Sequence, residues 1–294
     1  MSDWQQRMAL LRPYLNRFKR RFSVLDLGCG DGAVGRAIAR EYDASVFLLD
    51  RDITEPIEYE LPRVTLLKHN ITPVELHALA DCEHFGVVLA LNFLHHFGSD
   101  WRVAVDATLR IGQHTFIQLP DDNSGGVAGR DILPQLTAHV GAAQATLLGY
   151  PNQHTGRDPR PLWVLVGPRE KRLTGHVWKG QMEPLLVYAS YDKIHKEHRG
   201  GLQPWHVGMN LWNLLRLGVV WPTKARLASL VRAFTPEQAH GDIIPWNFIW
   251  DGEALHLCDW NGQFQREDAY GLEQTARIVE MSEPKYPADM TGWA

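Results

Sequence analysis

The stretch Phe22–Ala33, FSVLDLGCGDGA, decides the fold of this 294-residue chain. Its apolar first half predicts a buried strand, and the run Val34–Ala39 that follows predicts a helix. Glycines between a strand and a helix permit a tight turn and a close approach of the backbone to a ligand. The spacing of Gly28, Gly30 and Ala33 alone would also fit a dinucleotide-binding loop. The stretch therefore predicts a βα unit whose loop binds a ligand.

Asp26 indicates whether the loop binds a dinucleotide or a ligand of another kind. It lies within the predicted strand, two residues before Gly28. Burying a carboxylate is costly unless the carboxylate serves a cationic or donor-rich ligand. Such a group would sit poorly beside a dinucleotide pyrophosphate but well near the ammonium of a methionyl group. Asp26 therefore favours a ligand that carries an amino group.

Further apolar runs extend the strand pattern on both sides. Val46–Asp50 predicts a second strand that ends in an acid about 20 residues after the loop, where a carboxylate can accept both ribose hydroxyls. The other predicted strands are Val64–Leu67, Phe85–Asn92, Thr115–Pro120 and a closing antiparallel pair, Ala145–Gly149 and Pro161–Val166. Helical segments between them predict a doubly wound α/β domain. An amphipathic helix over Met8–Phe18 precedes it, and its basic face is either solvated or binds an anion.

The motif VLDLGCGDG, the acid Asp50 and the segment ALNFLHHF at residues 90–97 together resemble class I S-adenosylmethionine-dependent methyltransferases. The resemblance spans about residues 20–168 and implies a Rossmann-like sheet with S-adenosylmethionine as cofactor. At Asn70 the family more often has an aspartate. The implied cofactor contacts are Asp26, Gly28 and Gly30 for the methionyl part, Asp50 for the ribose, Asn70 for the adenine and Asn92 for the sulfonium.

His95 and His96 follow the fourth predicted strand and would lie near the methyl donor. The unperturbed pKa of a histidine suits a catalytic base, so one of the two could serve as the base, and either could instead serve in packing. A phosphate or carboxylate acceptor would need no base, only cationic positioning. Because the Asn-Pro-Pro-Tyr-type motif of many nucleic-acid amino-methyltransferases is missing, we expect a small-molecule or glycan acceptor, and a phosphorylated acceptor is one of the alternatives.

The side-chain composition changes after a polar break at Pro168–Gly175. Seven of the 11 tryptophans lie between Trp178 and Trp260, where they serve core packing or, alternatively, sugar stacking. The break predicts a methyltransferase domain over residues 1–168 and a second domain over residues 169–294.

The second domain contains His240–Asn247, HGDIIPWN, followed by a predicted hairpin that leads to Asp259. The segment resembles the kinase-like superfamily, especially aminoglycoside phosphotransferases and lipopolysaccharide kinases. The resemblance implies Asp242 as catalytic residue, Asn247 and Asp259 as Mg²⁺ ligands, and ATP as a further cofactor. Because the chain is too short for a complete kinase and a glycine-rich flap is missing, we expect a small, mostly helical C-lobe with a short hairpin.

Three functions stay open on the sequence. The first is a methyltransferase whose kinase-like part recognises a substrate or partner. The second is a bifunctional kinase-methyltransferase, similar to bacterial O-antigen chain-terminating enzymes that carry the two domains in this order. The third is a non-enzymatic scaffold.

Composition sets outer limits on these functions. Hydrophobic residues make up 45% of the chain and charged residues 22%, which is typical of a globular protein. The net charge of −4 gives no general attraction to nucleic acid. The three cysteines form no CxxC motif, and no apolar run is long enough to span a bilayer. We therefore expect a cytoplasmic protein, with an oligomer or protein partner possible.

Overall fold

The fold is described by a computed structural model, and the residues described are 2–19, 21–53, 61–119, 129–141, 145–151, 159–166, 208–220, 223–235, 243–257 and 268–281. The expected domain boundary near residue 168 lies outside these residues, as do Asp242 and Asp259.

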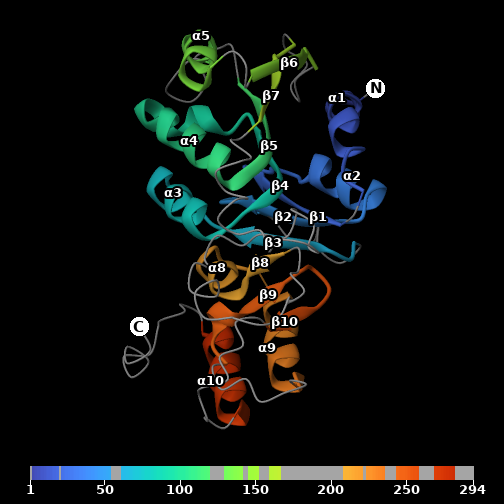
Figure 1. The fold of residues 1–294 in the computed structure, drawn as a ribbon, viewed down its shortest axis with the longest axis vertical. Coiled ribbons are helices and arrows are strands. Elements are labelled where there is room, and N and C mark those ends of the chain that lie inside the picture. The colour runs from blue at the N-terminus through green and yellow to red at the C-terminus, as the bar shows by residue number, and fades with distance from the viewer. Residues whose placement is uncertain are drawn as a thin grey trace, which may run out of the picture.

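A seven-stranded sheet forms the centre, in the order β3-β2-β1-β4-β5-β7-β6 (Figure 1). Strands β1 to β5 pair in parallel, whereas β7 runs antiparallel to both β5 and β6. The fold is thus the predicted Rossmann-like α/β sheet, and the closing antiparallel pair is confirmed. The strands are β1 Phe22–Leu27, β2 Ala44–Asp50, β3 Val64–Lys68, β4 Phe85–Leu91, β5 Gly112–Gln118, β6 Ala145–Gly149 and β7 Leu162–Val166.

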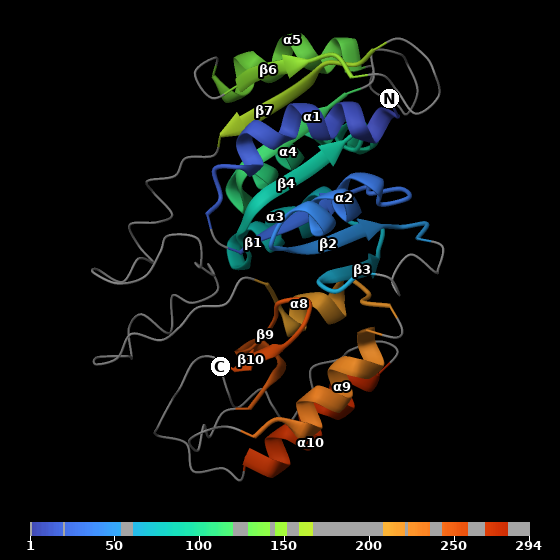
Figure 2. The same cartoon turned by 90° about the vertical axis from the view of Figure 1, so that its right-hand side faces the viewer.

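Helices cover both faces of this sheet, with α1 and α2 on one face and α3 and α4 on the other (Figures 1 and 2). A short 3₁₀ helix, η2, follows β4 and carries His95 and His96. The helices of this part are α1 Asp3–Leu15, α2 Ala33–Glu41, α3 Pro73–Cys82, η2 Leu94–Asp100, α4 Trp101–Ile111 and α5 Gly129–Val140.

The unit β1–loop–α2 forms as the sequence predicts. All six residues of β1 are buried, so the strand lies in the middle of the sheet. Helix α2 packs closely on β2 because it carries Gly35, where an added Cβ would lie 2.4 Å from Leu48 Cδ2. This close packing sets the position of the α2 N-terminus beside the end of β1.

The described C-terminal residues form a small antiparallel sheet with helices around it. The predicted hairpin is confirmed as β9 and β10, joined by a turn at Asp251–Gly252. The helical spacing of apolar residues over 209–218 predicts a helix there, but α8 begins only at Leu211, because Met209 and Asn210 pair with β9 as strand β8. The elements are β8 Met209–Asn210, α8 Leu211–Arg216, α9 Thr223–Ala233, η4 Pro245–Asn247, β9 Phe248–Trp250, β10 Leu255–Leu257 and α10 Asp268–Glu280.

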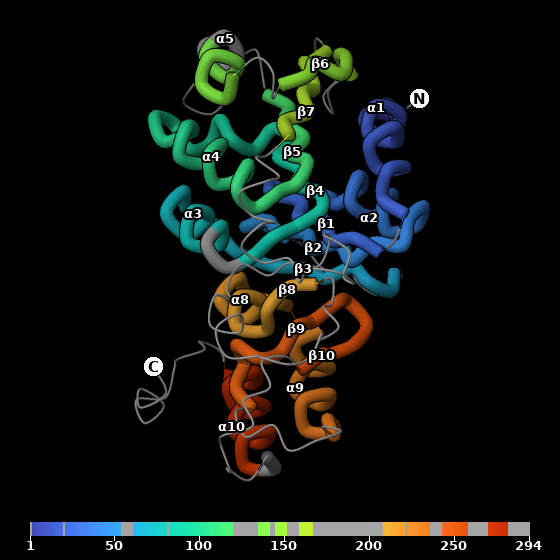
Figure 3. Tube along the Cα trace, viewed as in Figure 1, coloured from blue at the N-terminus to red at the C-terminus, as the bar shows by residue number. Residues whose placement is uncertain are grey.

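This C-terminal part packs against the β3 edge of the large sheet (Figure 3). Lys68 N–H donates to the Gly218 carbonyl at 2.9 Å, so the segment after α8 continues the sheet by an antiparallel bridge. Deeper inside, Trp250 Nε1 donates to Thr65 Oγ1 at 2.9 Å. One cluster of buried apolar side chains includes members of β3, α3, α8 and β9. Burial of this shared core holds the two parts together.

Candidate functional site

The candidate cofactor residues come together where the carboxyl ends of parallel strands meet at one edge of the sheet. Two adjoining cavities, of about 530 and about 410 Å³, lie there and share Gly28 and Asn92 in their walls. The larger cavity is also lined by Asp50 and Asn70, and the smaller one by Asp26 and Gly30. All six predicted cofactor residues therefore line one cavity or both.

Asp50 joins the end of β2 to the glycine loop. Its Oδ2 accepts a hydrogen bond of 2.9 Å from the Gly30 N–H, and its Oδ1 accepts one of 3.0 Å from the Asp52 N–H. A carboxylate offers about four acceptor positions, so two stay available for the hydroxyls of a ligand. Asp50 thus both holds the loop and presents acceptors to the larger cavity.

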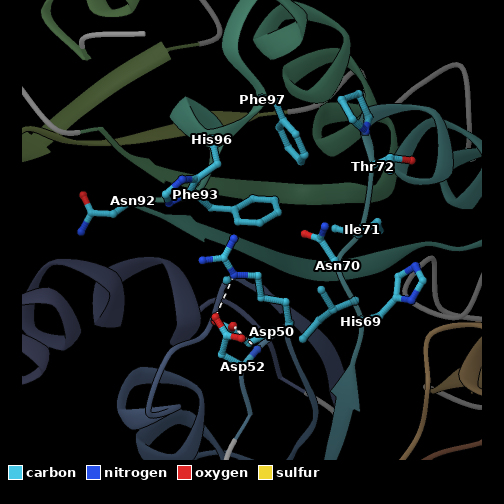
Figure 4. A pocket seen from close by; sticks show the side chains of 14 residues that line it. Asp50, Asp52, His69, Asn70, Ile71, Thr72, Asn92, Phe93, His96 and Phe97 are labelled. Atoms are coloured by element: carbon cyan, nitrogen blue, oxygen red, sulfur yellow. Dashed lines mark hydrogen bonds and ion pairs between the residues drawn. The ribbon is translucent and has the colours of Figure 1, made fainter. Parts of the chain in front are cut away.

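Gly28 allows the loop to approach an aromatic wall. Its φ of +65° is left-handed, and an added Cβ would lie 2.5 Å from Cδ2 of Phe93. Figure 4 shows Phe93 between Asp50 and His96, with Phe97 and Ile71 beyond it. The rings of Phe93 and Phe97 meet edge to face, 5.0 Å apart.

These side chains give the larger cavity two chemical halves. Ile71, Phe93 and Phe97 supply apolar surface, and Asn70 at the end of β3 supplies an amide (Figure 4). Flat apolar surface beside an amide suits a heterocyclic base, and the carboxylate of Asp50 suits a sugar. In Figure 4 the side chain of Asn92 points away from these residues, and Asn92 also lines the smaller cavity.

Asp26 is 3% exposed, and burial raises the pKa of its carboxyl group to about 7. The charge of Arg7 and a hydrogen bond from the Gly35 backbone oppose this effect on the pKa. A buried carboxyl group with a raised pKa fits a site that receives a cation, because a cationic ligand would stabilise its ionised form.

Sequence reasoning missed a polar network beside Asp26. Arg7 of α1 donates from Nε to Gln118 Oε1 at 2.9 Å, and Arg160 donates from Nη1 to Asn92 Oδ1 at 2.9 Å. Gln118 Nε2 in turn donates to the Arg160 carbonyl at 3.3 Å. The available signal was the basic face of the first helix, but no spacing along the chain indicated its partners.

The two candidate catalytic histidines are placed differently. His96 lines the larger cavity, and burial together with the charge of Arg51 lowers its pKa. His95 is 4% exposed and is not among the residues that line either described cavity. The centroids of their rings lie 4.0 Å apart, so the two imidazoles pack against each other.

The candidate Mg²⁺ site is described only at Asn247, which is 5% exposed in η4. Its neighbour Trp246 lies 5.6 Å from the ring of Trp212, and Trp250 is 1% exposed, so these rings serve packing.

Within the described ranges no group of three or more His, Cys, Asp or Glu side chains could hold a metal ion. Nor is any described helix sufficiently long and apolar to span a membrane.

No protein-family model matches the sequence, and no curated protein matches it. Solved structures show a distant likeness. The bifunctional kinase-methyltransferase WbdD is 14% identical with a TM-score of 0.44, and the match covers 87% of this chain and 74% of that one. The 1,6-didemethyltoxoflavin-N1-methyltransferase of Burkholderia thailandensis, with bound S-adenosylhomocysteine, is 16% identical with a TM-score of 0.42. The match covers 56% of this chain and 78% of that one. The magnesium protoporphyrin IX methyltransferase of Synechocystis PCC 6803, with bound S-adenosylmethionine, is 13% identical with a TM-score of 0.41. The match covers 56% of this chain and 79% of that one. At these values the likeness carries no conclusion about activity.

Proposed function

We propose that this chain is an S-adenosylmethionine-dependent methyltransferase acting on a small-molecule or glycan acceptor, with residues 1–168 as its catalytic domain. One observation carries the proposal. The six residues that the sequence resemblance assigns to the cofactor come from four different strand ends, yet all of them line two adjoining cavities. The residue types at these strand ends, two carboxylates, two amides and a glycine loop, support the proposal beyond the meeting of the strand ends itself, which the fold imposes.

The two cavities fit the two ends of S-adenosylmethionine. In the larger one, Ile71, Phe97 and Asn70 would hold the adenine, and Asp50 would accept from the ribose hydroxyls. In the smaller one, Asp26 and the Gly28–Gly30 loop would hold the methionyl ammonium. Gly28 and Asn92, which both cavities share, would then flank the sulfonium.

Bound S-adenosylmethionine supplies an already electrophilic methyl group, so the chain mainly orients the acceptor and removes a proton where the acceptor carries one. His96 is the candidate base. Its lowered pKa keeps the imidazole neutral, and therefore able to accept a proton, near neutral pH. We assign to His95 the positioning of His96, because it packs against that ring and lines neither described cavity.

For residues 169–294 we propose recognition of the acceptor or of a partner. The described part of this segment is joined to β3 at Lys68, two residues before Asn70, although none of its described residues lines either cavity. The bifunctional alternative requires ATP and Mg²⁺ at Asp242, Asn247 and Asp259, and it predicts Mg²⁺-dependent ATP binding that Asp259→Ala abolishes. The recognition function predicts methylation without ATP turnover, unchanged by that substitution.

Calorimetric titration of the full chain with S-adenosylmethionine, and separately with ATP–Mg²⁺, tests the proposal. We expect saturable cofactor binding that Asp50→Asn weakens at least about tenfold, since hydrogen bonds to a charged group are lost. Asp106→Asn is the matched control, because Asp106 is exposed on α4 and lines neither cavity. Absence of cofactor binding, or equal binding by both variants, would contradict the methyltransferase. Saturable ATP–Mg²⁺ binding would favour the bifunctional enzyme.

A further inference from the structure

One continuous stretch of chain, residues 69–73, forms the side of the larger cavity that we assign to the adenine, and it joins β3 to α3 (Figure 4). At its β3 end the His69 N–H donates to the Asp50 carbonyl at 3.1 Å. At its α3 end the Thr72 N–H donates to Glu75 Oε2 at 2.8 Å. The position of this stretch, the adenine wall, therefore depends on where β3 and α3 lie.

The C-terminal part is hydrogen-bonded to β3 directly before the adenine wall. The Lys68 N–H donates to the Gly218 carbonyl at 2.9 Å, and the Val220 N–H donates to the Leu66 carbonyl at 3.2 Å. Strand β3 is the last strand of the seven-stranded sheet, so residues 218–220 pair with backbone groups at an edge of that sheet. This contact ends at Lys68, and the next residue is the first of the wall.

Helix α3, at the other end of the wall, is also joined to the C-terminal part. Glu83 follows the last turn of α3 and is fully buried, and its Oε1 accepts from the Asn210 N–H at 3.0 Å and from Asn213 Nδ2 at 2.6 Å. Leu79 of α3 and Asn213 of α8 line one cavity of only about 20 Å³, so the two helices lie against each other. Both elements that flank the adenine wall therefore rest on the same neighbour.

Gly218 makes the close contact with β3 possible. Its φ of +67° is left-handed, and an added Cβ would lie 2.5 Å from the Lys68 carbonyl oxygen. A side chain at this position would therefore displace the end of β3 or break the hydrogen bond beside it. Neither Gly218 nor Val220 lines a described cavity, so an effect of this contact on a ligand must pass through the elements between them.

We infer that the C-terminal part is a positioning element of the cofactor site, and that it holds the adenine wall in place through β3 and α3. The inference rests on the proposed methyltransferase function and gives the C-terminal part a role in cofactor binding in addition to recognition. Coupling between two sites is reciprocal. A change at Gly218 must therefore weaken cofactor binding, and a bound cofactor must in turn stabilise the contact at Val220.

Hydrogen exchange of the full-length wild type, followed by NMR, tests the second consequence without any substitution. We expect saturating S-adenosylhomocysteine to slow exchange of the Lys68 and Val220 amides at least about fivefold, the lower end of typical coupling between sites. Amides of α10, at the far end of the C-terminal part, should exchange at an unchanged rate (Figure 1). Equal slowing in α10 would mean global stabilisation alone and would overturn the inference, as would an unchanged rate at Val220.

Calorimetry of S-adenosylhomocysteine binding tests the first consequence with a matched pair of variants. Gly218→Ala and Gly141→Ala both place an alanine at a left-handed φ, but at Gly141 nothing lies within 4 Å of the added Cβ. We expect only Gly218→Ala to weaken binding, at least about fivefold, while circular dichroism shows that both variants are folded. Equal affinities of the two variants overturn the inference.

The wild-type exchange rates decide the question if Gly218→Ala does not fold. Failure of the wild type to bind S-adenosylhomocysteine would defeat the proposed function instead.

Discussion

Asp50 accepts a hydrogen bond of 2.9 Å on Oδ2 from the backbone N–H of Gly30, which lies on the neighbouring strand's loop. This contact connects the two segments that would hold the two ends of the cofactor. It places the candidate ribose acceptor and the candidate methionyl loop in one hydrogen-bonded unit. The site is therefore organised across β1 and β2 before a ligand binds.

Replacing Asp50 by asparagine should weaken binding of S-adenosylhomocysteine and of 5′-methylthioadenosine equally, each at least about tenfold. Both ligands carry the ribose. The Asp50 carboxylate accepts hydrogen bonds on both of its oxygens, whereas an asparagine side chain has only one oxygen that can accept them. Calorimetry with the two ligands measures the change, and Asp106→Asn is again the control. A loss confined to S-adenosylhomocysteine would contradict the ribose assignment.

Asp26→Asn should give the opposite pattern. S-adenosylhomocysteine carries an ammonium group that 5′-methylthioadenosine lacks, so only its affinity should fall, by about tenfold. In the wild type the affinity for S-adenosylhomocysteine should also rise as the pH increases through about 7, because the ligand binds the ionised carboxylate. Calorimetry across this pH range measures both effects. Equal losses for the two ligands would place the amino group elsewhere.

Alanine substitutions at Gly28 and Gly30 are a matched pair that tests the close contact of the loop with the ring of Phe93. Both have a left-handed φ, so an alanine at either position strains the backbone by about 1–2 kcal/mol. Only at Gly28 would the new Cβ collide with Phe93, whereas nothing lies within 4 Å at Gly30. We expect Gly28→Ala to weaken S-adenosylhomocysteine binding and lower the unfolding free energy more than Gly30→Ala does. Urea unfolding and calorimetry compare the two variants, and equal effects would contradict the close contact between Gly28 and the Phe93 ring.

The burial of Glu83 leads us to expect a specific pH dependence of the free energy of unfolding. It is fully buried, and its Oε1 accepts from the Asn210 N–H at 3.0 Å and from Asn213 Nδ2 at 2.6 Å. Burial raises the pKa of Glu83 from the ordinary 4.5 to about 8, so between these values the folded state keeps a proton that the unfolded chain has lost. The wild type should therefore lose stability relative to Glu83→Gln as the pH rises from about 5 to about 8, by at most about 1.4 kcal/mol per pH unit.

Urea unfolding of both proteins across that pH range measures the difference, and other titrating groups cancel between them. A stability difference that does not change with pH would show that the Glu83 carboxyl keeps an ordinary pKa.

Much of the large sheet follows from local pattern, because each strand is a short apolar run. The stretch from Phe22 to Ala39 predicts its strand, loop and helix, and the hairpin around Asp251–Gly252 is predicted by its turn residues. The helix predicted from Met209 begins later because its first two residues pair with β9. That pairing depends on a partner about 40 residues away, which periodicity does not report.

The candidate site was predictable where function is tied to a motif. The cofactor residues Asp26 and Asp50 stand at fixed positions relative to strand ends, so the chain order locates them. Arg7 and Arg160 stand in no motif, and the structure connects them through Gln118 at the end of β5, which accepts from Arg7 and donates to the backbone carbonyl of Arg160. The packing of the C-terminal part against β3 was not predicted for the same reason, since Trp250 and Thr65 are 185 residues apart.

A crystal structure of the full chain with S-adenosylhomocysteine tests the central claim most directly, because it locates the ligand rather than only detecting it. We predict one molecule across both cavities, with its ribose hydroxyls on Asp50, its ammonium beside Asp26 and its adenine against Ile71 and Phe97. A ligand bound outside these cavities, or bound with Asp26 and Asp50 both uncontacted, would contradict the account.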